Sequence, residues 1–434
     1  MSSPLSGSWA SLTLGLVFSL IVVGATSVRA QSTPDSLDRV RVRLHHKSNV
    51  SEVKLTVEDG PLAVYLPSGG PPAMRLQTGE TVVAGIRQTD VYVRRKNNGL
   101  YATRLDLRPA GEDASWSVSS DQLEARTYSG ELHLAPAPET NASLLLVNDV
   151  PLNDYVASVV AEEYGLDDRA GTRAMAVVAR TYGLFASAKF GGAYDQADGT
   201  ASQVYEGLDV ITDRSRRAAR ATKNEVLTYD GNLIQSVYFS SSGGHTANNE
   251  DVWDAEQPLP YLRGRDDPYD EGSPHHRWSV TVDRSSLLQM LTRDQGTLVE
   301  GFVIEDKAAH GRVETVKILR SDEKTPKMKA NAFRLLVNRN LEAVTLKSTW
   351  FTARRQGDQY VFEGRGFGHG VGLSQWGAHT MAQRGRSYRE ILRFYYTGVE
   401  IKPVENVQLD SITAPVATSP SPSATDTSTR RIGW

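Results

Sequence analysis

The sequence predicts an α+β fold in which a strand-rich N-terminal region, residues 31–125, is followed by a mixed α/β domain. Three observations support this prediction. Apolar and polar residues alternate up to about residue 150, helical spacing replaces the alternation after that point, and short strands and helices separated by glycines follow. The chain has 434 residues, 39% of them hydrophobic and 23% charged, which is enough material for two or three domains.

Short alternating segments, separated by Gly, Pro and Asn, predict the N-terminal strands. They are RVRVRL, VKLTV, LAVYL, TVVAGI and VYVRR. Two more strands, within RTYSGELHLAP and SLLLVNDV, are expected in residues 126–150. We place the start of the second domain at residue 126 and its end at residue 402.

Two helices are expected next. The first ends before Gly165, and the second begins after Asp168, a residue type that often caps helix N-termini. Each has one apolar stripe at helical spacing. The stripes are Leu152, Tyr155, Val156, Val159 and Val160, and then Ala170, Ala174, Val177, Val178, Thr181 and Phe185.

The remaining segments alternate between strands, a long loop and helices. Strands are expected in residues 225–240, a long loop in residues 245–277 and a further α/β stretch in residues 278–350. Loops of such length in compact domains are usually functional or mobile. A hairpin with its turn at residues 356–358 comes next.

Two helices are predicted near the end of the chain. One covers Ser374–Arg384, and the other opens with a capping box formed by Ser387 and Glu390 and closes at Gly398. Residues 403–434 are rich in Ser, Thr and Pro and are predicted to be disordered.

The first thirty residues are predicted to be a signal peptide. Residues 12–28 form a near-continuous apolar run, and small residues precede a cleavage point after Ala30. The alternative is an uncleaved anchor, since residues 1–11 contain no Lys or Arg, but the run is short for a membrane span. We therefore expect an extracytoplasmic protein, in the periplasm or cell wall, with no stable membrane span after cleavage.

Composition excludes several classes of function. The formal net charge of −3 does not favour nucleic acid as a partner. The absence of cysteine excludes disulfides, thiolate zinc sites and a cysteine nucleophile. The nine histidines form no His-Glu-x-x-His motif, and RDDPYDEG lacks EF-hand spacing. No metal and no cofactor are expected.

The most unusual segment is GRGFGHGVGLSQWGAHTMAQ, residues 364–383. It matches neither a dinucleotide fingerprint nor a P-loop. Its glycines indicate either a tight turn with positive φ angles or a place where a ligand approaches the backbone. His369, set between two glycines, either points into a cleft or is a structural hydrogen-bond donor.

A pair of carboxylates, Glu162 and Glu163, lies at the expected C-terminal end of the first helix. The helix dipole and the mutual repulsion of the two side chains both push a carboxyl pKa upward, which suits a general acid. Adjacent helical residues point in different directions, so at most one of the two serves a given cleft. The alternative is a pair of solvated surface glutamates.

The segment YFSSSGGHT, residues 238–246, runs from a strand into a turn rich in hydroxyl groups. It has no Gly-x-Ser-x-Gly nucleophile elbow. Its hydroxyls and amides suit hydrogen bonds to sugar hydroxyls or N-acetyl groups, and the alternative is a structural turn.

Five blocks, in order, give the sequence a resemblance to a known family. They are VNDVPLNDYVASVVAEEYG, RAMAVVARTYGLFA, TASQVYEG, VYFSSSGGHT and GRGFGHGVGLSQWGAHTMAQRGRSYREILRFYYTGV. Together they resemble the domain of stage II sporulation protein D and the LytB amidase enhancers over residues 126–402. Characterised enzymes of that family are lytic transglycosylases, which cut peptidoglycan glycan strands stripped of stem peptides.

The resemblance implies a glycan cleft with one catalytic residue. The final acid of the family's Val-Val-x-x-Glu block falls on Glu163, with Glu162 as its non-catalytic neighbour. One carboxyl group suffices, because the sugar's own C6 hydroxyl attacks C1 and gives a 1,6-anhydro product. Substrate-binding roles are expected for Ser240, Ser241, Ser242, Gly243, Gly244, Thr246, His369, Gly370, Ser374 and Gln375.

Two other functions stay open at this point. One is a non-catalytic protein that binds glycan and enhances an N-acetylmuramoyl-L-alanine amidase, and the other is a wall-binding module formed by the N-terminal strands. The sequence also departs from the family pattern. Tyr164 and Gly165 replace a Met-Pro pair, AGTRAM replaces the usual opening of the second helix, and the zinc ligands that some members carry are absent from DQADGTASQ.

Overall fold

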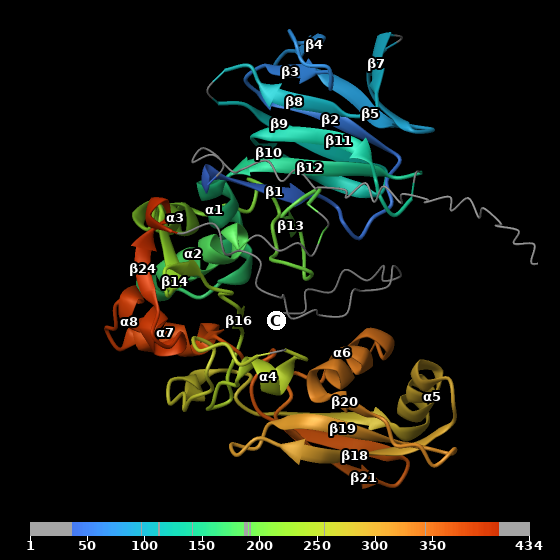
Figure 1. Ribbon diagram of the computed structural model, residues 1–434, viewed down its shortest axis with the longest axis vertical. Coiled ribbons are helices and arrows are strands. Elements are labelled where there is room, and N and C mark those ends of the chain that lie inside the picture. Colours follow the sequence, from blue (N-terminus) through green and yellow to red (C-terminus); the bar gives the residue numbers. More distant parts are fainter. Residues whose placement is uncertain are drawn as a thin grey trace, which may run out of the picture.

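The computed structural model describes residues 37–407, apart from residues 97, 112, 141, 186–189, 191, 256 and 343. The predicted signal peptide and residues 408–434 of the predicted tail lie outside the described residues. Figure 1 shows a β-sandwich, a layer of helices beside it, and a second α/β body that carries α5 and α6. The predicted α+β class is confirmed.

The N-terminal sandwich consists of two sheets whose apolar faces meet. Their strand orders are β13-β1-β12-β11-β8-β3-β4 and β10-β9-β2-β5-β6-β7. Strict alternation explains the packing: in β2, Val53, Leu55 and Val57 are buried, whereas Glu52 and Lys54 are exposed. The strands are β1 Arg39–Arg43, β2 Glu52–Asp59, β3 Leu62–Tyr65, β4 Met74–Leu76, β5 Thr81–Arg87, β6 Asp90–Arg95, β7 Asn98–Ala102, β8 Leu105–Pro109, β9 Ser115–Ser120, β10 Leu123–Ser129, β11 Glu131–Pro136 and β12 Leu144–Pro151.

The domain boundary that we expected at residues 125 and 126 falls inside β10. β10 pairs with β9, and β11 and β12 lie between β8 and β1 in the other sheet. The strands of residues 126–150 therefore belong to the sandwich. Alternation predicts that a strand exists, but its partners depend on long-range pairing that the pattern does not reveal.

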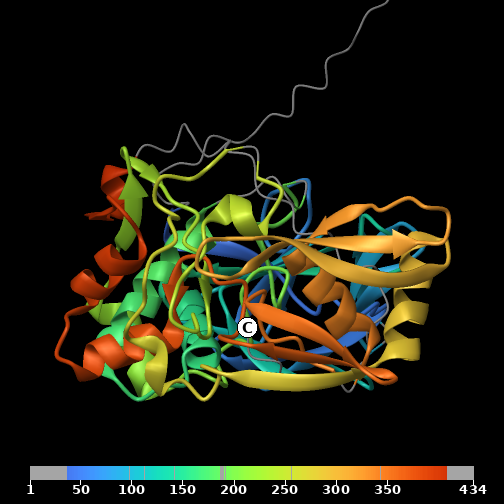
Figure 2. The same cartoon turned by 90° about the horizontal axis from the view of Figure 1, so that it is seen from below.

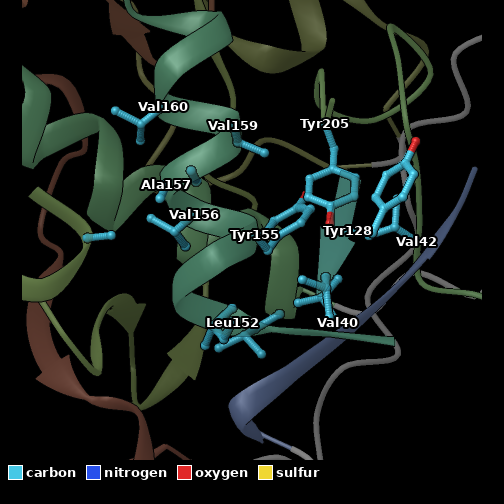
Figure 3. Close-up of a cluster of buried hydrophobic side chains, with 14 of the residues drawn as sticks. Val40, Val42, Tyr128, Leu152, Tyr155, Val156, Ala157, Val159, Val160 and Tyr205 are labelled. Atoms are coloured by element: carbon cyan, nitrogen blue, oxygen red, sulfur yellow. The ribbon is translucent and has the colours of Figure 1, made fainter. Parts of the chain in front are cut away.

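The helical layer is built on α1 Leu152–Glu163, α2 Arg169–Leu184 and α3 Asp213–Ala221. The predicted cap is present, since the side chain of Asp168 accepts a hydrogen bond from the backbone N–H of Gly171. In Figure 3, Tyr155 of α1 and the neighbouring Tyr205 lie beside Tyr128 and Val42 of the sandwich. The sandwich and the helical layer thus share one hydrophobic core.

Short strands and two C-terminal helices complete this domain. The central strand β14 pairs with β15 on one side and β24 on the other. The capping box of Ser387 and Glu390 is confirmed at the start of α8, which ends at Tyr395, before Gly398. The elements are β13 Gln196–Ala197, β14 Glu225–Tyr229, β15 Asn232–Leu233, β16 Tyr238–Phe239, α4 Asn249–Val252, β23 Leu373–Ser374, α7 Gln375–Gln383, α8 Tyr388–Tyr395 and β24 Glu400–Pro403.

The second α/β body is inserted between β16 and β23 and has its own core, which includes Phe302, Phe333 and Phe362. Its two ends meet, because Trp278 pairs with Gly364. Figure 2 shows its orange strands extending away from the red C-terminal helices, with α5 at the far side. Its elements are β17 Trp278–Asp283, α5 Arg284–Gln295, β18 Val299–Lys307, β19 Val313–Arg320, β20 Lys327–Lys329, α6 Ala330–Asn340, β21 Phe351–Gln356 and β22 Gln359–Gly364.

Among the described helices, none has the combined length and hydropathy that crossing a bilayer requires.

Candidate functional site

Glu163 is the last residue of α1, and its side chain is held inside the protein, with 9% of the residue exposed. The backbone N–H of Val204 donates to its Oε1 at 2.9 Å. The side-chain amide of Gln375, at the start of α7, donates to the backbone carbonyl of Glu163 at 2.7 Å. Three of the sequence blocks therefore meet at this residue.

Three tyrosines lie close enough to Glu163 for its charge to act on their hydroxyl groups. Burial raises the pKa of Tyr155, Tyr182 and Tyr238, and the negative charge of Glu163 adds to the effect. For Tyr182 the pKa rises to about 12. All three phenols are therefore neutral near pH 7 and able to donate hydrogen bonds.

Gln203 ties two of these phenols together. Its carbonyl oxygen accepts from the hydroxyl of Tyr155 at 2.8 Å, and its amide nitrogen donates to the hydroxyl of Tyr238 at 3.2 Å. Gln203 is 1% exposed, so both contacts are fixed within the protein. The carboxyl group of Glu163 therefore lies near neutral phenols, two of which are fixed in position by Gln203.

The serine-rich turn wraps around a different carboxylate, that of the fully buried Asp270. Asp270 accepts from the hydroxyl of Ser241 at 2.8 Å and from the backbone N–H groups of Ser242 at 2.7 Å and Gly243 at 2.8 Å. The hydroxyl of Ser374 lies 3.3 Å from the same carboxylate. Hydroxyls and amides that we expected to face a glycan thus have partners inside the protein.

The other predicted turn residues also have internal contacts. The backbone N–H of Gly244 donates to the hydroxyl of Ser242 at 3.1 Å, and the hydroxyl of Thr246 accepts from the backbone N–H of Arg265 at 3.0 Å. The carbonyl of Ser240 accepts from the N–H of Trp376 at 3.0 Å. The glycan-binding role of these residues stays a prediction.

His369 connects the glycine-rich turn to β16 through hydrogen bonds to the backbone. The carbonyl of Tyr238 lies 2.9 Å from Nε2, which must therefore carry the proton, and Nδ1 accepts from the N–H of Val371 at 3.1 Å. Burial lowers the pKa of His369 to about 3, so the ring is neutral near pH 7. Both ring nitrogens are occupied by backbone groups.

At two glycines of this turn, other atoms of the protein lie so close to the backbone that a side chain would collide with them. At Gly370, where φ is +91°, a Cβ atom would lie 2.7 Å from Cζ of Arg312. At Gly372, where φ is +80°, it would lie 2.1 Å from the carbonyl oxygen of Val237. Of the two explanations that the sequence leaves open, the tight turn with positive φ angles fits both positions, and the atoms that approach the backbone there belong to the protein itself.

Sequence reasoning missed the phenols, Gln203, Val204 and the buried Asp270. Tyr155 was expected only as part of the apolar stripe of its helix, Tyr182, Gln203 and Val204 belong to blocks that we quoted only for their resemblance, and no spacing rule links any of them to Glu163. Asp270 belongs to RDDPYDEG, which we considered only as a calcium loop. In the part of the chain that the structure describes, no three His, Asp or Glu side chains converge as a metal site requires.

Two pockets in the described residues lie elsewhere. One, of about 420 Å³, lies between α1 and α3 and is lined by Val160, Tyr164 and Arg214 among others. The other, of about 610 Å³, lies on the inserted body beside Leu288 and Leu298. Neither is lined by Glu163 or by another residue predicted for the site.

The comparisons with known proteins agree with the arrangement of the blocks. A family model described as stage II sporulation protein matches residues 140–229, and a domain of unknown function (DUF8618) matches residues 255–372, which contain the inserted body. An uncharacterized protein of Brachyspira hyodysenteriae is 27% identical over 81% of this chain and 93% of its own length.

Two of the similar proteins come from Bacillus subtilis. The amidase enhancer is 27% identical over 88% of this chain, which spans 57% of that protein, and stage II sporulation protein D is 30% identical over 60% of this chain and 76% of its own length. With this similarity, and with the five blocks folded around Glu163 and Asp270, the chain belongs to the SpoIID/LytB family.

Proposed function

We propose that the protein is an exported peptidoglycan lytic transglycosylase in which Glu163 acts first as general acid and then as general base. The observation that supports this most is the placement of Glu163: a carboxyl group within the protein, oriented by the N–H of Val204 and close to three neutral phenols. The resemblance to the family implies the same catalytic role for this glutamate.

The reaction needs one carboxyl group and no water. The protonated carboxyl of Glu163 donates its proton to the glycosidic oxygen between N-acetylmuramic acid and N-acetylglucosamine, the bond from C1 to that oxygen breaks, and N-acetylglucosamine leaves as an alcohol. The carboxylate then takes the proton of the C6 hydroxyl as O6 attacks C1. A 1,6-anhydro sugar forms and Glu163 is protonated again, whereas hydrolytic glycosidases need two carboxyl groups.

The test is a product assay with a matched variant. The purified protein is incubated with peptide-stripped glycan strands, and 1,6-anhydro ends are sought by mass spectrometry, with Glu163→Gln in parallel. Gln keeps the size and can accept from Val204, but it cannot transfer a proton. Anhydro products from the parent alone support the proposal, and products from both proteins would remove Glu163 from its role.

A second candidate is a glycan-binding enhancer of an N-acetylmuramoyl-L-alanine amidase. It is favoured by the amidase enhancer of Bacillus subtilis, whose similarity extends over 88% of this chain. In this case the protein and Glu163→Gln stimulate amide cleavage by a wall amidase equally, and neither gives anhydro ends. The same two proteins therefore separate the two functions.

The proposal places the protein outside the cytoplasm, where its substrate lies. Export with cleavage after Ala30 is tested by sequencing the N-terminus of the protein recovered from the cell envelope. A mature chain that begins at Gln31 supports it, and an intact Met1 terminus in a membrane fraction supports the anchored alternative.

A further inference from the structure

The segment of residues 196–204 holds the carboxyl group of Glu163 from one side. Val204 donates to that carboxyl directly, and Gln203 fixes the hydroxyls of Tyr155 and Tyr238 beside it. The position of Glu163 therefore depends on what fixes residues 203 and 204, which belong to no helix or strand.

Internal hydrogen bonds close this segment into a compact turn. The backbone N–H of Ser202 donates to the carbonyl of Gly199 at 2.8 Å, and the N–H of Ala197 donates to the hydroxyl of Ser202 at 3.1 Å. A turn held in this way moves as one unit, so its attachment to the rest of the protein fixes the N–H of Val204 as well.

The attachment is made by Asp198, whose side chain is 7% exposed. Its Oδ1 accepts from Nδ1 of His46 at 2.7 Å and from the backbone N–H of His46 at 3.2 Å. Its other oxygen accepts from the backbone N–H of His45. Charge-assisted hydrogen bonds of this kind are about twice as strong as neutral ones.

His45 and His46 belong to the N-terminal sandwich, because they lie in the turn that follows β1. β13 pairs in parallel with β1, with Arg43 opposite Ala197, and the N–H of Asp198 donates to the carbonyl of Arg43 at 3.1 Å. The His46 ring lies against the turn, since a Cβ atom at Gly199 would lie 2.9 Å from its Cε1. The sandwich thus holds the turn through both backbone and side chains.

We propose that Asp198, together with His46, is a positioning residue for Glu163, so that the N-terminal sandwich is part of the active machinery. This inference rests on the proposed function for its kinetic consequence. Loss of the His46 side chain frees one anchor of the turn and lets the N–H of Val204 shift. A displacement of about 1 Å at a reacting group can cost on the order of 100-fold in rate.

The competing explanation is that the pair only stabilises the fold, and the chain offers a matched control for it. His133 and Asp106 form a similar pair, 2.8 Å apart, with side-chain exposures of 15% and 12% against 13% and 7% for His46 and Asp198. His133 and Asp106 lie on β11 and β8, which are separated in the sheet from β13 of the turn by β1 and β12.

The kinetic experiment compares three variants of the full chain on peptide-stripped glycan strands. We expect His46→Ala to lower kcat roughly 10- to 100-fold with little change in KM, and His133→Ala to leave kcat within about twofold although it lowers the melting temperature similarly. His46→Asn, which keeps a donor near the position of Nδ1, should restore most of the rate. Equal losses of kcat in His46→Ala and His133→Ala, or no loss in either, would overturn the proposal.

A second readout does not need activity. Hydrogen exchange of the Val204 amide, followed by NMR or mass spectrometry, should become at least about tenfold faster in His46→Ala and stay unchanged in His133→Ala. If the parent protein makes no anhydro product, the proposed function fails, but selective loss of Val204 protection still supports the positioning role. Unchanged protection in His46→Ala overturns it whatever the activity.

Discussion

Two carboxylates inside this domain, Glu163 and Asp270, have opposite surroundings. Asp270 is fully buried, and backbone N–H groups and hydroxyls of the serine-rich turn donate to it. Glu163 keeps 9% exposure and lies among neutral phenols and an amide. The donors of the serine-rich turn converge on Asp270, whereas neutral phenols lie near Glu163.

The difference shows that a segment rich in serine, glycine or histidine does not by itself identify the residues around Glu163. The serines, glycines and histidine that stand out in the sequence surround Asp270 or brace the turns beside it. Of the groups near Glu163, Tyr238 and Gln375 belong to those segments, whereas Tyr155, Tyr182 and the N–H of Val204 come from helices and a loop with no unusual composition. A comparison of the two carboxylates by mutation should therefore separate catalysis from folding.

The largest expected effect is the loss of reaction rate in Glu163→Gln. Glu163→Gln should lower the rate of anhydro-product formation by roughly 10²- to 10⁴-fold, because it removes the proton that the leaving oxygen needs. Its free energy of unfolding should stay within about 1 kcal/mol of the parent value, because the amide can still accept from Val204. Rates from product analysis and urea unfolding curves check both parts, and a large loss of stability would make Glu163 a structural residue like Asp270.

Asp270→Ala should show the opposite pattern. It leaves the N–H groups of Ser242 and Gly243 and the hydroxyl of Ser241 buried without an acceptor, which costs about 3 kcal/mol or more in the free energy of unfolding. Chemical denaturation measures the loss. The control is Asp266→Ala, a neighbouring acid whose side chain is 96% exposed and which should change stability little. Equal stability of the two variants would contradict the role of Asp270.

Asp267, which lies near Asp270, makes the stability of this region depend on pH. Burial, together with the negative charge of Asp270, raises the pKa of Asp267 from 3.8 to about 6. Between these values the folded state binds more protons than the unfolded state, so this group's contribution to stability falls as pH rises from about 4 to 6 and is constant above that. The total change is about 3 kcal/mol.

The measurement compares unfolding of the parent protein and Asp267→Asn at pH 4 and pH 7. Because Asn stays neutral, the stability of the variant relative to the parent should increase by up to about 3 kcal/mol between the two pH values. A constant difference would show that Asp267 ionises in the folded protein as it does in the unfolded chain.

The smallest effect is expected at Ser374, which caps α7 and faces Asp270. Its hydroxyl accepts from the N–H of Gly377 at 3.2 Å. Ser374→Ala should cost about 1 kcal/mol in the free energy of unfolding and leave glycan affinity unchanged, as measured by sedimentation with purified cell wall. A large fall in affinity with unchanged stability would return Ser374 to the glycan-binding role that the sequence predicts.

Much of the fold could be predicted because local signals agree with it. Alternation predicted the strands of the sandwich, Asp168 and Ser387 predicted helix starts, and residues 356–358 predicted the turn of the β21–β22 hairpin. The limit of the first domain was not predictable, since β11 and β12 join the sandwich through partners such as β8 that are distant in sequence.

Of the candidate site, the sequence indicates one side chain and none of its contacts. Glu163 could be proposed from its place at a helix end and from the family block. The N–H of Val204 could not, because a backbone amide leaves no trace in residue identity. The acceptor role of Asp270 could not be predicted either, since it arises from a turn about 30 residues earlier that folds back onto it.

The pairing of Trp278 with Gly364 has a consequence for how this family can vary. Paired residues on antiparallel strands are about 5 Å apart, so everything between them leaves and returns through one narrow neck. The body also reaches back to the turns beside this neck, because Arg312 donates to the backbone carbonyls of Ser242 at 2.7 Å and His245 at 3.1 Å. Evolution can therefore lengthen or exchange the outer part of the inserted body through the neck, whereas the part that carries Arg312 has to stay in place.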